Sequence, residues 1–216
     1  MEVIKHELTK VVSLFWLAEP AGALYSPSVV NLIVERYKFV GYPRSLEEMR
    51  AEKVSFLHGE FEGRAIESLE VYSDGIIASS RSDSELVDRF IEDIINWTES
   101  SFGHHRIDHQ KITKIYENHI LFQTKSDIFR VLTPLEAVKS MLSAGLKKSS
   151  NIDAEFHSFG LSFGVETSKL ASLKPIPFRI ERRIGTDFSR NIFVSAAPLP
   201  TREHLNVLNK LQELVG

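Results

Sequence analysis

The sequence predicts an α+β fold in which a mainly antiparallel sheet carries amphipathic helices packed on one face. Stretches with an apolar period of two, separated by turn residues, precede stretches with an apolar period of 3.6. The regular alternation of single strands and helices that builds a parallel sheet is absent. The order β-β-β-α occurs twice along the 216 residues, which suggests a pseudo-repeat, although no residue-level identity supports a duplication.

Four segments have residues that are typical of helix starts. Ser82-Asp83-Ser84-Glu85 matches a capping box, which would satisfy free amide groups at the start of a helix over 83–98. Residues 133–136 combine a second such box with proline at the first helical position, and Gly145 is expected to end that helix. The other two helices are predicted over 27–37 and, from Thr201 onward, over 201–214.

Six strands are predicted from period-two patterns and turn chemistry. They cover residues 54–61, 65–72 and 76–81 before the helix at 83–98, and residues 152–165, 176–184 and 191–197 before the last helix. Asp74-Gly75 is expected to supply the positive φ angles of a tight hairpin turn. A further strand region, 112–122, is expected to be broken at Glu117-Asn118.

Charge divides the chain into an acidic part, predicted over 1–148, and a basic part, predicted over 149–216. Residues 1–138 contain 15 Lys/Arg against 22 Asp/Glu, a net charge of −7, whereas residues 139–216 contain 11 against 7, a net charge of +4. Opposite net charges attract, so the two parts are expected to pack together as one compact unit or to meet between copies of the chain.

Composition excludes several classes of site. The chain has 43% hydrophobic residues, 25% charged residues and no cysteine, which is typical of a globular protein and leaves no cysteine ligand for zinc or iron–sulfur clusters. No cofactor is predicted. The apolar run 11–18 is too short for a signal peptide and is flanked by Glu7 and Glu19, so a retained, cytoplasmic protein without membrane contact is expected.

Residues 160–164, Gly-Leu-Ser-Phe-Gly, match the G-x-S-x-G pattern of a serine nucleophile elbow. Asp187 and His204 follow in the order used by α/β-hydrolases, so a triad with Ser162 can be written. The surrounding pattern indicates a strand rather than a strand–turn–helix elbow, and glycines in strands also have structural uses. A small serine hydrolase therefore stays an alternative, and no catalytic residue is favoured.

A histidine cluster is the densest group of metal-capable side chains. His105 and His109 would share a face if they lay on a helix, with Asp108 beside them. The H-E-x-x-H pattern is missing, and the segment follows a predicted helix end, so a polar loop without metal is expected.

Four arginines on the predicted hairpin 176–197 alternate with phenylalanines. Such a surface suits either single-stranded nucleic acid or a salt-bridged contact with the acidic part. The arginines are Arg179, Arg182, Arg183 and Arg190.

The expected function is protein–protein interaction without catalysis, in a homo-oligomer or as a small subunit of a larger cytoplasmic assembly. This expectation depends on the uneven charge and on the lack of a convincing catalytic pattern. Serine hydrolysis and single-stranded nucleic-acid binding stay open as alternatives.

Overall fold

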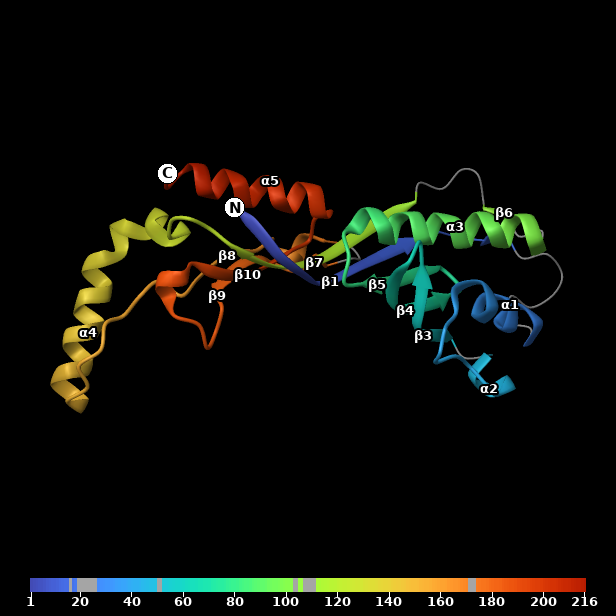
Figure 1. The fold of residues 1–216 in the computed structure, drawn as a ribbon, viewed down its shortest axis with the longest axis horizontal. Coiled ribbons are helices and arrows are strands. Elements are labelled where there is room, and N and C mark those ends of the chain that lie inside the picture. Colours follow the sequence, from blue (N-terminus) through green and yellow to red (C-terminus); the bar gives the residue numbers. More distant parts are fainter. Residues whose placement is uncertain (16, 19–26, 50–51, 103–104, 107–111, 171–173) are drawn as a thin grey trace.

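The fold is an eight-stranded antiparallel sheet with helices on one face. The computed structural model describes residues 1–216 except 16, 19–26, 50–51, 103–104, 107–111 and 171–173. The predicted α+β class is confirmed, and helices α3 and α5 lie along the same side of the elongated molecule (Figure 1). The strand order is β3-β4-β5-β1-β7-β10-β9-β8. No helix in the described part of the chain combines the length and apolar character needed to cross a bilayer.

The strands of this sheet are β1 (Glu2–Leu14), β3 (Lys53–Phe61), β4 (Arg64–Tyr72), β5 (Gly75–Ser80), β7 (Thr113–Gln123), β8 (Gly160–Phe163), β9 (Phe178–Arg182) and β10 (Ile192–Ala197). The short strands β2 (Leu17–Ala18) and β6 (His105–Arg106) pair with each other. The helices are α1 (Pro27–Tyr37), α2 (Leu46–Met49), α3 (Ser84–Phe102), α4 (Glu136–Ser150) and α5 (Thr201–Glu213).

Two hydrophobic clusters hold the helices against the sheet. The first lies beneath α1 and α3 and includes Val30, Phe56 and Phe90. The second lies beneath α5 and includes Phe122 and Phe193. The second cluster takes residues from both sides of the predicted division at 148, so the two charged parts share a core.

Helix α3 begins where the sequence predicts, but a different residue caps it. The Leu86 N–H donates to the Asp83 carboxylate over 2.8 Å, so Asp83 is the cap and Ser82 is not. The Ser82 carbonyl instead accepts a bond from the Thr9 hydroxyl at 2.6 Å. Several adjacent polar side chains can serve as a cap, and the pattern alone does not choose between them.

The prediction for α4 is wrong at both ends. The Thr133 hydroxyl donates to the Arg130 carbonyl inside a 3-10 helix (Ile128–Leu135), so the predicted capping box does not form. Helix α4 starts at Glu136, and its end comes at Asn151, whose φ of 54° reverses the chain. Gly145 therefore lies inside the helix.

The two central strands are the least predictable part of the sheet. The pattern predicts no strand over β1, and it predicts a break in β7, which is in fact continuous. Asn118, at the expected break, points into the helix-covered side of the sheet and is fully buried. A polar residue such as Asn118 is typical of turns, so its presence in a strand leads to the predicted break, although its side chain belongs to a buried polar network.

The hairpin turns use glycine differently from the prediction. Neither Asp74 nor Gly75 has a positive φ, whereas Glu62 and Gly63, between β3 and β4, have φ values of 48° and 71°. Gly75 is required for another reason, because an added Cβ would lie 2.4 Å from the Ser13 carbonyl oxygen. Glycine here permits a close backbone approach.

Candidate interaction surface

The three residues of the predicted hydrolase triad lie in separate environments. The Ser162 hydroxyl, on the edge strand β8, donates to the Phe178 carbonyl at 3.3 Å. Asp187 caps a 3-10 turn by accepting from the Ser189 N–H at 2.8 Å. Both ring nitrogens of His204 are occupied by other side chains. The geometry therefore does not assemble a triad from Ser162, Asp187 and His204.

His204 instead belongs to a buried polar network. Its Nδ1 lies 2.8 Å from Asn118 Oδ1, and its Nε2 lies 2.8 Å from Ser195 Oγ. All three side chains have no exposed surface. A serine–histidine–amide arrangement can be nucleophilic where substrate reaches the hydroxyl, but these atoms are closed to solvent.

The network continues to the starts of both long helices. The Asn118 amide donates to Thr9 Oγ1 at 2.8 Å and to Thr201 Oγ1 at 3.0 Å. The Ser84 N–H donates to Thr201 Oγ1 at 2.9 Å, and the Thr201 N–H donates to Ser84 Oγ at 2.8 Å. Each helix thus satisfies a first amide of the other, and the network joins α3, α5, β1 and β7. Polar residues within apolar strands are the sequence signal for it.

Burial sets the protonation state of His204. Desolvation, with a smaller contribution from repulsion by His119 and His6, lowers the pKa of its imidazole from 6.5 to about 4. The ring is therefore neutral at pH 7. Because the Asn118 oxygen can only accept, Nδ1 carries the hydrogen.

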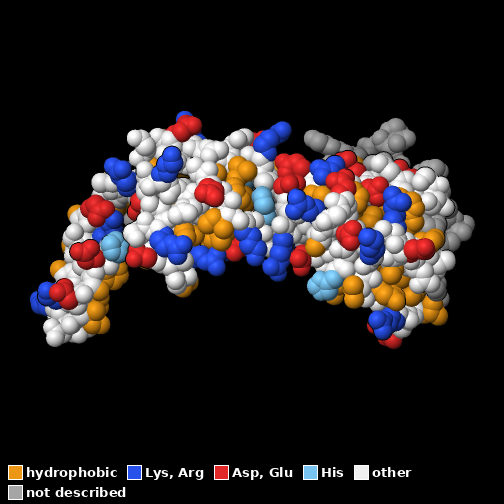
Figure 2. All heavy atoms as spheres, viewed as in Figure 1, with side chains coloured by type: hydrophobic (Ala, Val, Ile, Leu, Met, Phe, Trp, Pro, Cys, Tyr) orange, Lys and Arg blue, Asp and Glu red, His pale blue; other side chains and the backbone are white. Residues whose placement is uncertain are grey.

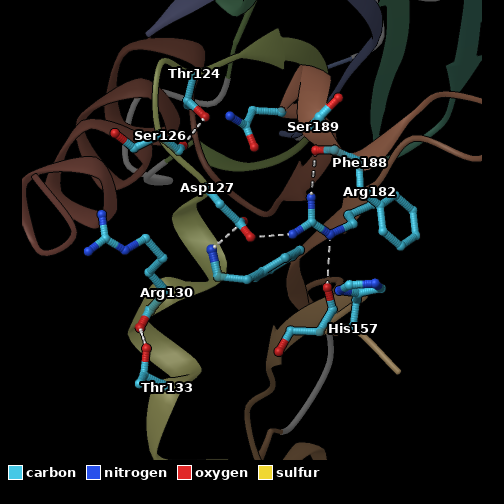
Figure 3. A network of polar contacts seen from close by, with 12 residues as sticks. Thr124, Ser126, Asp127, Arg130, Thr133, His157, Arg182, Phe188 and Ser189 are labelled. Atoms are coloured by element: carbon cyan, nitrogen blue, oxygen red, sulfur yellow. Dashed lines mark hydrogen bonds and ion pairs between the residues drawn. The ribbon is translucent and has the colours of Figure 1, made fainter. Parts of the chain in front are cut away.

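Arg182 is buried and bonded within the chain through all three nitrogens of its guanidinium group, which removes it from the predicted binding patch. Its side chain is 5% exposed and forms an ion pair with Asp127. Its Nε donates to the Ser158 carbonyl at 3.0 Å and its Nη1 to the Phe188 carbonyl at 3.3 Å. Figure 3 shows the guanidinium group aimed at Asp127 and at the Phe188 carbonyl. Three rings surround it at 4.7 to 5.5 Å, those of Phe129, Phe188 and Phe193.

The remaining arginines of the patch do not share a surface with Arg182. Along β9, exposed Arg179 and Glu181 alternate with buried Ile180 and Arg182, because successive side chains of a strand face opposite ways. Arg179 lies 3.9 Å from Glu181. Arg183 pairs with Glu7 of the acidic part at 3.7 Å, and the Arg190 carbonyl accepts from Gln123.

The predicted metal ligands Asp108 and His109 lie outside the described residues. His105 is in β6, and only its backbone is described. Among the residues that the structure describes, no three His, Asp or Glu side chains gather in a way that could hold a metal ion.

The most unusual surface is an arm made of α4 and the chain that returns from it, residues 136–158. None of the 15 residues of α4 is buried. Val138, Met141 and Leu142 form an apolar outer face, and Met141 is 75% exposed. The arm projects at the end of the molecule opposite α1 (Figure 1), and hydrophobic side chains lie exposed along it (Figure 2).

Polar contacts fill the inner side of the arm. The Phe156 N–H donates to Ser143 Oγ at 2.9 Å, and Lys147 pairs with Asp153 at 3.1 Å. Ser140 and Lys139 face a polar groove of about 510 Å³, which reaches Arg182. Sequence periodicity predicts a helix here, but it does not reveal that the apolar face has no cover.

No known protein family matches the sequence, and no curated protein matches it. The fold and the exposed arm therefore have to carry any functional argument.

Proposed function

We propose that the protein acts through protein–protein contact, as a homo-oligomer or as a small subunit of a larger assembly, with the arm as its contact surface. The observation that carries this proposal is the outer face of α4, where Val138, Met141 and Leu142 are each about half exposed or more. A helix of this length is marginally stable in water unless it packs an apolar face against something. Contiguous exposed apolar side chains are typical of interaction sites.

This function is favoured over the two alternatives on geometric grounds. A serine hydrolase needs a hydroxyl and an imidazole at an open cleft, whereas Ser162 is at a sheet edge and His204 is buried with Ser195. Nucleic-acid binding through the hairpin loses Arg182 to the core.

A cytoplasmic location is part of the proposal. The apolar run that imitates a signal peptide begins in β1, which pairs with both β5 and β7. Removing this run would take away part of the centre of the sheet, and this supports its retention in the working protein.

The test compares two adjacent substitutions in the arm, Met141→Glu on the outer face and Ser140→Glu on the inner side. Light scattering across a protein and salt series should show wild-type particles larger than one 24.5 kDa chain. Met141→Glu should weaken association by on the order of 10-fold or more, because it buries a charge in an apolar contact. Ser140→Glu should leave association unchanged.

An assembly with a different subunit would give a related result. A partner that co-purifies with wild type and with Ser140→Glu, but not with Met141→Glu, would support the subunit form. A single 24.5 kDa species at every protein and salt concentration, with no co-purifying partner, would contradict the proposal.

A further inference from the structure

The two halves of the chain repeat one order of elements. The first half runs β1, α1, β3, β4, β5, α3, and the second half runs β7, α4, β8, β9, β10, α5, if the short α2, β2 and β6 and the 3-10 turns are set aside. In the sheet, the strands from each edge inward are β3-β4-β5-β1 and β8-β9-β10-β7. The antiparallel pair β1–β7 lies at the centre, so an approximate two-fold relation makes α1 the counterpart of α4.

In the first half, α1 covers the outer strands. Val30, Ile33 and Tyr37 are buried in the cluster that also contains Val54 and Phe56 of β3. Phe56 is only 1% exposed as a result. This edge of the helix-covered face is closed.

In the second half, no helix among the described residues covers the equivalent place. Phe163 of β8 is 58% exposed, although it lies on the same face of the sheet as the second core cluster. It stacks on Phe178 at 6.1 Å, and Leu161 beside it is only partly buried. Leu161, Phe163 and Phe178 form what we call the β8 surface, next to α5.

The apolar residues of α4 have the same spacing as those with which α1 covers the first half of the sheet. The inward residues of α1 are Val30, Ile33, Val34 and Tyr37, at positions i, i+3, i+4 and i+7. The outer face of α4 has Val138, Met141, Leu142 and Gly145 at the same spacing. The sequence also places Ser-Pro before the first helix and Thr-Pro before the second.

The chain's own α4 is held away from the β8 surface. Lys147–Asp153 and Ser143–Phe156 tie the helix to its returning segment, and the left-handed Asn151 fixes the reversal between them. The outer face of α4 and the β8 surface are therefore both open in one chain, and α4 has the apolar spacing of the helix that covers the equivalent strands in the first half. Exchange of an identical element between two copies fills both surfaces at once.

We propose that α4 of one copy docks on the β8 surface of a second copy, in the place that α1 occupies over β3 in the first half. The exchange is reciprocal and gives a two-fold dimer. This inference rests on the proposed function and names its partner as a second copy of this chain.

The absence of cysteine allows a direct test by engineered disulfides. Met141→Cys and Phe163→Cys are made as separate proteins, mixed, allowed to exchange and oxidised with copper phenanthroline. The mixture should give a covalent dimer on a non-reducing gel, because the two thiols meet across the exchanged contact. Ser140→Cys, on the inner side of the arm, should give no such dimer with Phe163→Cys.

The double variant Met141→Cys/Phe163→Cys distinguishes exchange from closure within one chain. Exchange predicts cross-linked dimers, whereas an internal disulfide in a fast-migrating monomer at high dilution would overturn the inference. Circular dichroism checks that each variant keeps the secondary structure of the wild type.

Failure of the inference and failure of the proposed function give different results. Self-association that Met141→Glu weakens, without any cross-link between positions 141 and 163, would refute arm exchange and leave the arm as a contact surface. A monomer at all concentrations with no cross-link would refute both.

Discussion

The side chain of His204, in α5, is held by two polar partners on the sheet, Asn118 of β7 and Ser195 of β10, and has no exposed surface. Its neutral form suits this place, because desolvation lowers the pKa of the ring to about 4. The unfolded chain exposes the same ring, whose pKa returns to the ordinary value of 6.5. The difference ties folding stability to pH through one residue.

We expect His204 to contribute to acid destabilisation. Between about pH 6.5 and pH 4 the unfolded chain binds a proton that the folded chain refuses, so stability is highest above pH 6.5 and falls as the pH drops through this window. The loss attributable to this ring is on the order of 3 kcal/mol. Urea unfolding of wild type and His204→Gln at pH 7 and pH 4.5 should show a smaller pH effect in the variant.

An exposed histidine gives the matched control. His157 lies on the arm segment with a half-exposed side chain, and His157→Gln should keep the pH dependence of the wild type. Equal pH dependence in His204→Gln and wild type would mean that folding does not shift the pKa of His204, against the expectation.

The elements differ in how well the sequence predicts them. Helices α3 and α5 follow from a 3.6-residue apolar period, a signal that lies within the segment itself, and α3 also has a local cap at Asp83. The central strand β1 escapes prediction because it pairs with β5 and β7, far along the chain, and carries charged residues on its open face. The helix character of α4 is predicted, whereas its isolation depends on long-range packing that no local pattern contains.

Two glycine substitutions should change stability in opposite directions. Gly75→Ala places a Cβ 2.4 Å from the Ser13 carbonyl oxygen, so the hairpin must shift at a cost of about 2 kcal/mol. Gly145→Ala lies inside α4 with no atom within 4 Å of the added Cβ, and it should stabilise the helix by about 1 kcal/mol. Chemical denaturation and helical circular dichroism measure the two effects. A stabilising Gly75→Ala would contradict the close approach described above.

On the scale of the whole molecule, the approximate two-fold relation pairs a packed helix with an unpacked one. The candidate site lies where the two halves differ. Most of the apolar side chains of α1 are buried, whereas none of those of its counterpart α4 is buried. The sequence shows the β-β-β-α order twice. The apolar faces of α1 and α4 have the same period and a similar composition, so the sequence pattern does not distinguish the packed helix from the unpacked one.

Equivalent substitutions in the two helices should therefore differ in the monomer. Val30→Ala in α1 removes a side chain that is 2% exposed and should cost about 2 kcal/mol of unfolding free energy. Val138→Ala in α4, at the matching position and 52% exposed, should change stability by less than about 0.5 kcal/mol. Unfolding curves recorded at concentrations where light scattering finds single chains provide the comparison. Equal losses would mean that α4 packs within its own chain.

The reciprocal bonds between Ser84 and Thr201 have a mechanical consequence for the molecule. Each hydroxyl accepts the other residue's N–H, so fraying at one helix start strips a partner from the other. Loosening at the start of either long helix is therefore expected to loosen the start of the other, although the two lie in different halves of the chain.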